Sequence, residues 1–365
     1  MDDAVSLLVD MLEIYSPSGR EGELASYLKD SMEELGYSRV RLDRAGNVYG
    51  EIGGGEPTVL LCGHMDTIRG WIPVRLKDGR LYGRGSVDAK SSLAAMIYAA
   101  ATLNFERLEG RVLVSGVVDE ERRSRGIRQL LREGLEVDYA IFGEPSGLDS
   151  ITFAYKGRLR FKVYCRASPG HVGAKHLFSN AIEEAYNLWT RIKGLFDELK
   201  SPHGLFYSPT PCLIGIRSRG VAGATPSLCV LDIDLRLPPT LRCGEAEDLV
   251  RGVMEGFKGG GTTLSVGFRI LDRVEPFVAD RRTPLMKALA EAIEEVVGVP
   301  ARFIRKTGTG DMNIFGSRVG VPVATYGPGN SRLSHTNDEY VKVDEYLTSI
   351  RVYRRTLEKL LSGSV

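Results

Sequence analysis

The sequence has few cysteines, almost no net charge and no long hydrophobic run. Its five cysteines are scattered over 365 residues without a C-x-x-C pair, which argues against a disulfide framework and against a thiolate zinc site. The formal net charge of +1 creates no overall field that would attract nucleic acid or an anionic membrane. The longest mostly apolar stretch, Leu93 to Leu103, is shorter than the ~18 residues that a membrane span needs. Met1-Asp2-Asp3-Ala4 lacks the features of a secretory signal, so we expect a cytoplasmic protein that binds neither nucleic acid nor membrane.

The order of the expected elements indicates two domains, which suits a chain of 365 residues. In 1–153 and 274–365, apolar strands alternate with helices, which predicts an α/β domain with a mixed, largely parallel sheet and helices on both faces. Between 154 and 273 the order becomes β-α-β-β-α-β, and Lys156–Ala167 alternates apolar and polar residues as a half-exposed strand does. This split βαβ pattern predicts an inserted α+β domain over 154–273.

The most informative motif is Gly63-His64-Met65-Asp66-Thr67, which follows the apolar run Val59-Leu60-Leu61-Cys62. A strand therefore brings a histidine and an aspartate to the point where backbone pairing ends. Such a histidine can give one ring nitrogen to a metal while a nearby carboxylate holds the other ring N–H. Taken alone the pair is weak evidence, because a histidine beside an aspartate is common in exposed turns.

Similar polar groups follow four other apolar runs or glycine-rich turns. They are Asp88 after the turn at 82–87, Asp119-Glu120-Glu121 after 112–118, Glu144 after 141–143, and His335 after the glycine-rich segment 327–329. Ligands bind in the crevice at the carboxyl ends of strands in open α/β sheets. Imidazole and carboxylate groups gathered there suit zinc, cobalt or manganese. Each group alone is more often a helix cap or a solvated charge. Five such coincidences at separate strand ends favour a two-metal hydrolase.

These motifs carry a family resemblance. The sequence resembles the zinc metallopeptidase and deacylase family that includes acetylornithine deacetylase, succinyl-diaminopimelate desuccinylase, glutamate carboxypeptidase and the carrier-protein-linked lysine/ornithine hydrolases. The motifs that match, in order, lie at 63–67, 83–90, 119–121, 143–146 and 334–336. The resemblance extends over nearly the whole chain, and the inserted domain is similar to the lid and dimerisation domain of that family.

The resemblance implies two divalent metal ions per chain, Zn²⁺ first and Co²⁺ second, with Asp88 as the bridging ligand. Two further ligands would complete each site, and they are His64 and Glu144 for one ion and Glu121 and His335 for the other. A cis peptide bond after the bridging aspartate is frequent in the family, which makes Asp88-Ala89 a candidate.

The resemblance also assigns two catalytic roles near these ligands. Glu120 would be the general base that takes a proton from a water bridging the two metals and later protonates the leaving amine. Asp66 would hold the second ring nitrogen of His64. Glu120 and Glu121 would point to opposite sides of a continuing strand, so a bend must bring both to the site.

In the inserted domain, the resemblance singles out three residues and a homodimer formed through this domain. His171 would reach an active site, often that of the partner subunit, and stabilise the oxyanion, whereas alone it is a turn histidine. Arg236 would bind the substrate carboxylate, and Thr309 lies in the glycine-rich substrate loop. One departure is Gly223-Ala224-Thr225-Pro226, where the family usually has Asn-x-x-Pro.

Several segments look like the carrier-linked subgroup, among them Ile72-Pro73-Val74 and 306–313. Its members release lysine or ornithine, linked through the α-amine to the γ-carboxyl of the C-terminal Glu of an acidic amino-group carrier protein, in lysine and arginine biosynthesis. A basic rim would suit that carrier, and the arginines available for it are Arg122, Arg123, Arg125, Arg128, Arg217 and Arg219. A solvated helix face explains those arginines equally well.

Other functions fit the same motifs. The first alternative is an N-acetylornithine or N-acetyllysine deacetylase, or another small-molecule deacylase or dipeptidase. An aminopeptidase and a metal-binding interaction protein without catalysis are weaker alternatives. The last would usually have lost a ligand or the base, and here Glu120 and all five ligand candidates are present.

Overall fold

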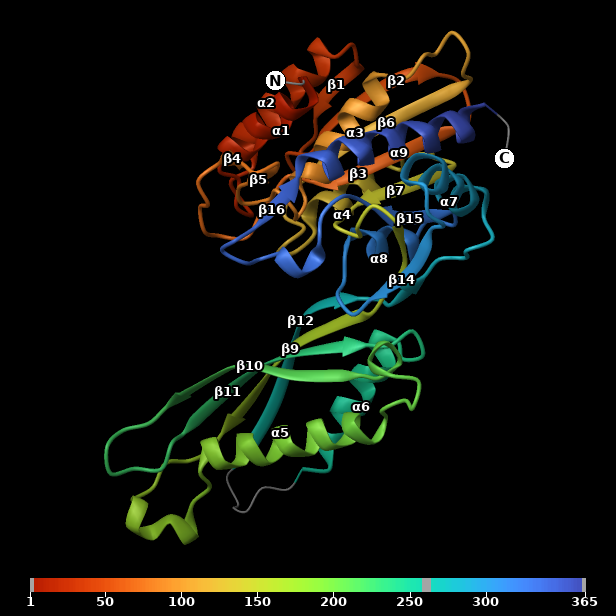
Figure 1. Ribbon diagram of the computed structural model, residues 1–365. Coiled ribbons are helices and arrows are strands. Elements are labelled where there is room, and N and C mark those ends of the chain that lie inside the picture. Colours follow the sequence, from red (N-terminus) through yellow and green to blue (C-terminus); the bar gives the residue numbers. More distant parts are fainter. Residues whose placement is uncertain (1–2, 258–263, 363–365) are drawn as a thin grey trace. The chain divides into compact units, whose positions relative to one another are not determined.

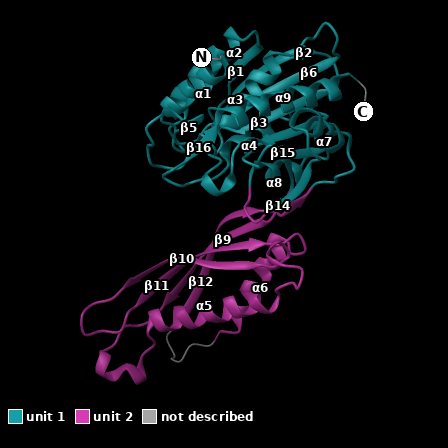
Figure 2. Ribbon diagram, viewed as in Figure 1, with its two compact units in different colours: residues 1–153, 279–305, 310–365 teal, residues 154–278, 306–309 magenta. Residues whose placement is uncertain are grey.

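The computed structural model describes residues 3–257 and 264–362 and contains two compact units (Figure 2). Within the described residues, unit 1 comprises 3–153, 279–305 and 310–362, and unit 2 comprises 154–257, 264–278 and 306–309. Unit 2 thus extends beyond the expected end at residue 273 and includes a second, short segment. The expected domain ranges also take in residues 1–2, 258–263 and 363–365, which lie outside the described residues.

A nine-stranded mixed sheet, most of whose strands belong to unit 1, has its main strands in the order β1-β2-β6-β3-β7-β15-β8-β13, and β14 pairs with β8 (Figure 1). The strands are β1 Ser38–Leu42, β2 Val48–Gly54, β3 Thr58–His64, β6 Gly110–Val117, β7 Tyr139–Gly143, β8 Ser150–Tyr155, β13 Phe277–Val278, β14 Arg302–Lys306 and β15 Val323–Tyr326. The central strands β6, β3, β7 and β15 are parallel, and antiparallel pairs flank them. The mixed sheet expected from the sequence is confirmed, and the carboxyl ends of its four central strands share one edge.

Helices cover both faces of this sheet, as expected. They are α1 Asp3–Glu13, α2 Gly22–Glu34, α3 Lys90–Ala101, α4 Arg125–Arg132, α7 Pro284–Val297, α8 Asp311–Gly316 and α9 Val343–Leu361. Neighbouring residues of a strand point to opposite faces. On β7, a Cβ at Gly143 would contact Ser92 of α3, whereas the ring of Phe142 lies 5.4 Å from that of Phe315 of α8. None of the helices in the described residues is long and apolar enough to cross a membrane.

A small three-stranded sheet was not expected from the sequence. Its strands are β4 Arg75–Lys77, β5 Arg80–Tyr82 and β16 Tyr340–Lys342, in the order β16-β5-β4. The first two form a hairpin through Asp78 and Gly79, both with positive φ. The third comes from a segment far along the chain, and it brings the residues after His335 beside the turn that precedes Asp88.

Unit 2 has the split βαβ order that the sequence predicts. Its elements are β9 Gly157–Arg166, α5 Ala181–Glu198, β10 Thr210–Arg219, β11 Leu228–Leu237, α6 Cys243–Glu255 and β12 Ser265–Val274, with short 3₁₀ helices at Val172–Leu177 and Leu205–Tyr207. The four strands form an antiparallel sheet in the order β10-β11-β9-β12. Burial alternates along β9 and β11, and the buried side chains pack against α5 and α6 in one core.

A fully buried lysine anchors the loop before β10. Lys156 Nζ donates hydrogen bonds to the backbone oxygens of Leu205 (3.2 Å) and Ser208 (2.6 Å) and to Oγ1 of Thr210 (2.7 Å). Burial, followed by the nearby Arg236, lowers the pKa of Lys156 from 10.5 to about 8. The folded state therefore binds this proton less tightly than the unfolded chain.

We expect Lys156→Met to lower the free energy of unfolding by about 2–4 kcal/mol at pH 7, because the three acceptors lose their donor. The unfolded chain binds more protons at this site between pH 8 and 10.5. Stability contributed by the wild-type lysine therefore rises across that interval, and the gap to the variant widens. Urea unfolding at pH 7 and pH 10 measures both effects. Lys193→Met, which breaks only an exposed i,i+4 ion pair, is the control, and an equal loss in both variants would contradict the anchoring role.

Candidate metal centre

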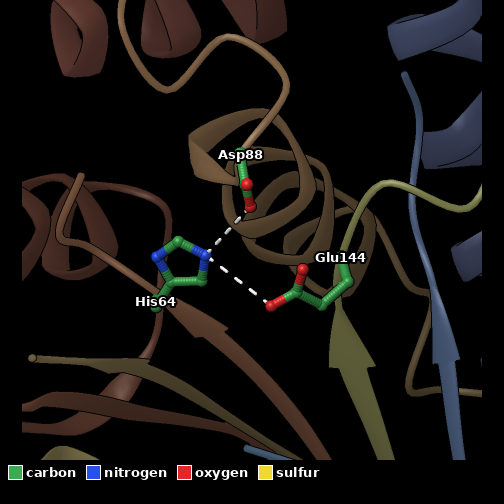
Figure 3. Close-up of side chains that lie close together, drawn as sticks. All are labelled: His64, Asp88 and Glu144. Atoms are coloured by element: carbon green, nitrogen blue, oxygen red, sulfur yellow. Dashed lines mark ion pairs between the residues drawn. The ribbon is translucent and has the colours of Figure 1, made fainter. Parts of the chain in front are cut away.

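The first group of potential metal ligands joins three segments at the carboxyl edge of the sheet (Figure 3). His64 is the last residue of β3, Glu144 directly follows β7, and Asp88 precedes α3. His64 Nε2 lies 3.5 Å from Oδ1 of Asp88 and 3.7 Å from Oε1 of Glu144. The imidazole is buried and its Nε2 has no hydrogen-bond partner, while both carboxylates are partly exposed.

These distances suit a shared ion better than hydrogen bonds. Two ligand atoms that are each about 2.0–2.2 Å from a tetrahedral zinc ion lie roughly 3.3 Å apart. A buried ring nitrogen without a partner, with two carboxylate oxygens at 3.5 and 3.7 Å, fits that geometry. The residues present therefore fit a divalent cation.

A second group shares Asp88 with the first. His335 Nε2 lies 3.4 Å from Oδ2 of Asp88 and 2.8 Å from Oε1 of Glu121. Asp88 thus offers one carboxylate oxygen to each histidine, which is the arrangement that a bridging ligand requires. The Asp88-Ala89 peptide bond is cis, as the resemblance implies.

A sharp bend after β6 presents the neighbouring glutamates, and the sequence alone did not reveal it. Asp119 has φ = +63°, a left-handed conformation that aspartate tolerates better than most residues. The Asp66 carboxylate then accepts hydrogen bonds from the backbone N–H of Glu120 (2.9 Å) and of Glu121 (3.1 Å). Asp66 therefore fixes the backbone that carries both glutamates.

This arrangement corrects the expected link between Asp66 and His64. The close partner of His64 Nδ1 is the backbone oxygen of Asp66 at 2.8 Å, whereas the nearest oxygen of its carboxylate lies at 3.6 Å. The carboxylate is turned toward the two glutamate N–H groups and the hydroxyl of Ser18 (2.7 Å). Either acceptor places the proton on Nδ1 and leaves the lone pair of Nε2 available to a metal ion.

The potential ligand His64 and the neighbouring Glu120 are surrounded by an excess of carboxylates. Burial alone lowers the pKa of His64, but Asp88 and Glu144 raise it well above its ordinary value. Burial, followed by Glu144, raises the pKa of Glu120 well above its ordinary range. Both shifts reflect carboxylates that repel further negative charge and attract positive charge, so the electrostatics favour a cation at this point.

Asp311 and Glu339 were not among the expected site residues. Asp311, at the start of α8, is buried in the same small cavity as Glu120 and His64, and burial raises its pKa to about 7. Glu339 contacts the backbone of the turn that holds Asp88. Asp311 could have been suspected from its place in the glycine-rich loop, whereas no sequence feature pointed to Glu339.

The three remaining expected residues belong to unit 2. His171 is exposed, and its Nδ1 accepts a hydrogen bond from the N–H of Gly173 (3.1 Å), so the neutral ring carries its proton on Nε2. Arg236 and Thr309 lie far apart in sequence but meet, with 3.4 Å between Nη1 and Oγ1. Asp234 also binds Arg236, at 2.7 Å.

Residues 223–226, which differ from the family's usual Asn-x-x-Pro, contact the loop that carries His171. Gly170 donates its N–H to Oγ1 of Thr225 (2.9 Å), and Thr225 donates its own N–H to the backbone oxygen of Gly170 (2.7 Å). His171 and Ala224 form an isolated antiparallel bridge beside these bonds. The segment that replaces Asn-x-x-Pro therefore contacts the neighbouring loop through its threonine.

Comparison with solved structures shows the fold. A metallo-carboxypeptidase of the M20 family from Sulfolobus solfataricus superposes with a TM-score of 0.82 at 21% identity, and the match covers all of both chains. A dinuclear metal-binding peptidase of the same family from Bacillus subtilis gives 0.70 at 13% identity, covering 98% of each chain.

Sequence comparison identifies the family. A [LysW]-lysine/[LysW]-ornithine hydrolase of Saccharolobus islandicus is 31% identical over 361 residues, 99% of this chain and 97% of the relative. A protein of Thermococcus kodakarensis is 36% identical over 361 residues, 98% of this chain and 92% of the relative, and it carries the same name as a provisional assignment. The model of peptidase family M20/M25/M40 matches residues 60–359, and the chain belongs to that family.

Proposed function

We propose that this protein is a metal-dependent amide hydrolase that releases lysine and/or ornithine from the γ-carboxyl of the C-terminal Glu of an amino-group carrier protein. The observation that carries the hydrolytic part is the pair of ligand groups that share Asp88, with Glu120 beside them. The substrate class is supported by the names of relatives that are 31–36% identical over nearly the whole chain.

Zinc is the proposed metal, with cobalt as the second choice. Each group offers one imidazole nitrogen and carboxylate oxygens, which suit borderline cations better than calcium or magnesium. We assign Asp88 as the bridging ligand, His64 and Glu144 to one ion, and Glu121 and His335 to the other.

Two such ions, when bound, acidify a water and polarise the carbonyl oxygen of the scissile amide. The oxygen of this water attacks the carbonyl carbon, and the Glu120 carboxylate accepts the proton that the water loses. The same carboxyl then gives that proton to the amide nitrogen, so that the C–N bond breaks and the amine leaves. Asp66 fixes Glu120 through its backbone N–H during both transfers.

In unit 2, the proposal keeps the roles that the resemblance implies. His171 Nε2–H is a donor for the oxyanion, and Arg236 with Thr309 binds the substrate carboxylate. A homodimer through unit 2 is part of the proposal, supported by β10, an edge strand with exposed Ile214 and Ile216. We propose a cytoplasmic location for the enzyme. An acidic carrier protein would bind near the exposed Arg122 and Arg123, which follow Glu120 and Glu121 in the sequence.

A side-by-side assay tests the substrate. We expect the zinc-loaded protein to release lysine from the carrier-linked form with kcat/KM at least about 100-fold above that for free Nα-acetyllysine, because docking energy is available only to the carrier. Chromatographic detection of free lysine measures both reactions. Faster cleavage of Nα-acetyllysine or Nα-acetylornithine would instead establish a small-molecule deacylase.

A further inference from the structure

Glu339 is a buried carboxylate that binds the turn leading to Asp88. Its Oε1 accepts three backbone hydrogen bonds, from the N–H of Gly85 (3.1 Å), of Val87 (2.9 Å) and of Asp88 itself (3.0 Å). Its Oε2 accepts a hydrogen bond from Nη1 of Arg84 at 2.8 Å. Glu339 is 1% exposed and Arg84 is 5% exposed, so solvent does not screen these contacts.

The turn needs this external acceptor. Its conformation depends on Gly85, which has φ = +91° and leaves no room for a side chain, since a Cβ would lie 2.9 Å from Cγ2 of Thr67. Residues 83–88 belong to no helix or strand, and among their N–H groups that of Gly83 donates to the backbone oxygen of Glu339 (3.4 Å) and that of Ser86 to the backbone oxygen of Gly83 (3.1 Å). Three other N–H groups of the turn converge on one oxygen of Glu339, which makes the turn an anion-binding concavity.

Glu339 also belongs to the segment that carries the other histidine. His335 stands four residues earlier and has φ = +65°, and β16 begins at the residue after Glu339. This strand pairs with β5 immediately before the Asp88 turn, where Tyr340 lies opposite Tyr82. One side chain therefore ties together two segments that approach each other only in the folded protein.

We propose that Glu339 is a positioning residue that holds Asp88 and the His335 segment in the metal-binding arrangement and so sets how tightly the metals bind. The inference rests on the metal site of the proposed function. The Glu339 carboxylate reaches Asp88 through a hydrogen bond from its backbone N–H and leaves the Asp88 carboxylate to the two histidines. Residues that orient metal ligands in this way affect metal affinity by about 10- to 100-fold.

Zinc affinity of the metal-stripped protein, measured by competition with a chromophoric chelator, tests this role without relying on activity. We expect Glu339→Gln to weaken zinc binding by about 10- to 100-fold. In that variant the Arg84 guanidinium attracts the amide oxygen and turns the NH₂ group toward the three backbone donors. The double variant Arg84→Met/Glu339→Gln frees the oxygen to face those donors, and we expect it to recover most of the lost affinity.

Asp43 provides a matched control. Its Oδ1 also accepts three backbone N–H bonds, from Ala45 (2.7 Å), Gly46 (2.9 Å) and Asn47 (3.0 Å), but in a turn that carries no proposed ligand. Asp43→Asn is expected to lower the melting temperature and leave zinc affinity within about twofold of wild type.

The possible results distinguish a failure of this inference from a failure of the proposed metal-dependent function. Wild-type zinc affinity in a folded Glu339→Gln variant would overturn the positioning role and leave the proposed function standing. If Glu339→Gln does not fold, Glu339→Asp, which keeps the charge but shortens the reach, must show the same loss of affinity or the inference fails. A wild-type protein that binds no zinc would overturn the proposed function and this inference together.

Discussion

Glu120→Gln is expected to lower kcat by about 10²- to 10⁴-fold while both metals stay bound. The amide keeps the size and most contacts of the glutamate but cannot accept a proton from water. The backbone N–H of residue 120 still bonds to Asp66, so the neighbouring Glu121, a proposed ligand, keeps its position. Steady-state release of lysine from the carrier-linked substrate, with metal content measured on the same sample, gives the result.

Two comparisons make that result specific. Metal content near two ions per chain in Glu120→Gln shows that the lost rate reflects lost proton transfer. Ser18→Ala, which removes only the hydroxyl bond to Asp66, is expected to cost far less. Full activity of Glu120→Gln with two metals bound would assign the proton transfer to another group.

Asp88→Ala is expected to have the largest effect of any single ligand change, because it removes a ligand from both ions at once. Neither group keeps more than two of its three side chains, and activity should fall to background. His64→Ala removes a ligand from one group only, and we expect the other ion to remain bound. Metal analysis after dialysis, together with lysine release, distinguishes the two variants.

Chelation of the wild-type protein should reproduce the Asp88→Ala result, and added Zn²⁺ or Co²⁺ should restore activity only to the wild type. Retention of two tightly bound ions by Asp88→Ala would show that the aspartate does not bridge them.

The potential ligands could be predicted because each follows a strand or turn with a recognisable pattern. His64 and Glu144 come directly after apolar runs, and the topology of parallel strands brings such positions to one edge. The split βαβ order of unit 2 was predictable for a similar reason, since alternating burial leaves a periodic signal in β9 and β11.

The details that hold these ligands in place could not be predicted. The bend at Asp119 depends on backbone conformation, which aspartate permits but does not dictate. The carboxylate of Asp66 faces two backbone N–H groups rather than His64, a choice that requires the folded positions of both segments. Glu339 acts on a turn about 250 residues earlier, and a single sequence carries no sign of such long-range contacts.

The measurement that tests the central claim most directly is anomalous X-ray diffraction at the zinc edge from crystals of the zinc-loaded protein. The account predicts two peaks per chain, about 3.5–4 Å apart. One should lie among His64, Asp88 and Glu144, and the other among Asp88, Glu121 and His335. A single peak, or peaks bound by other residues, would contradict a two-metal centre bridged by Asp88.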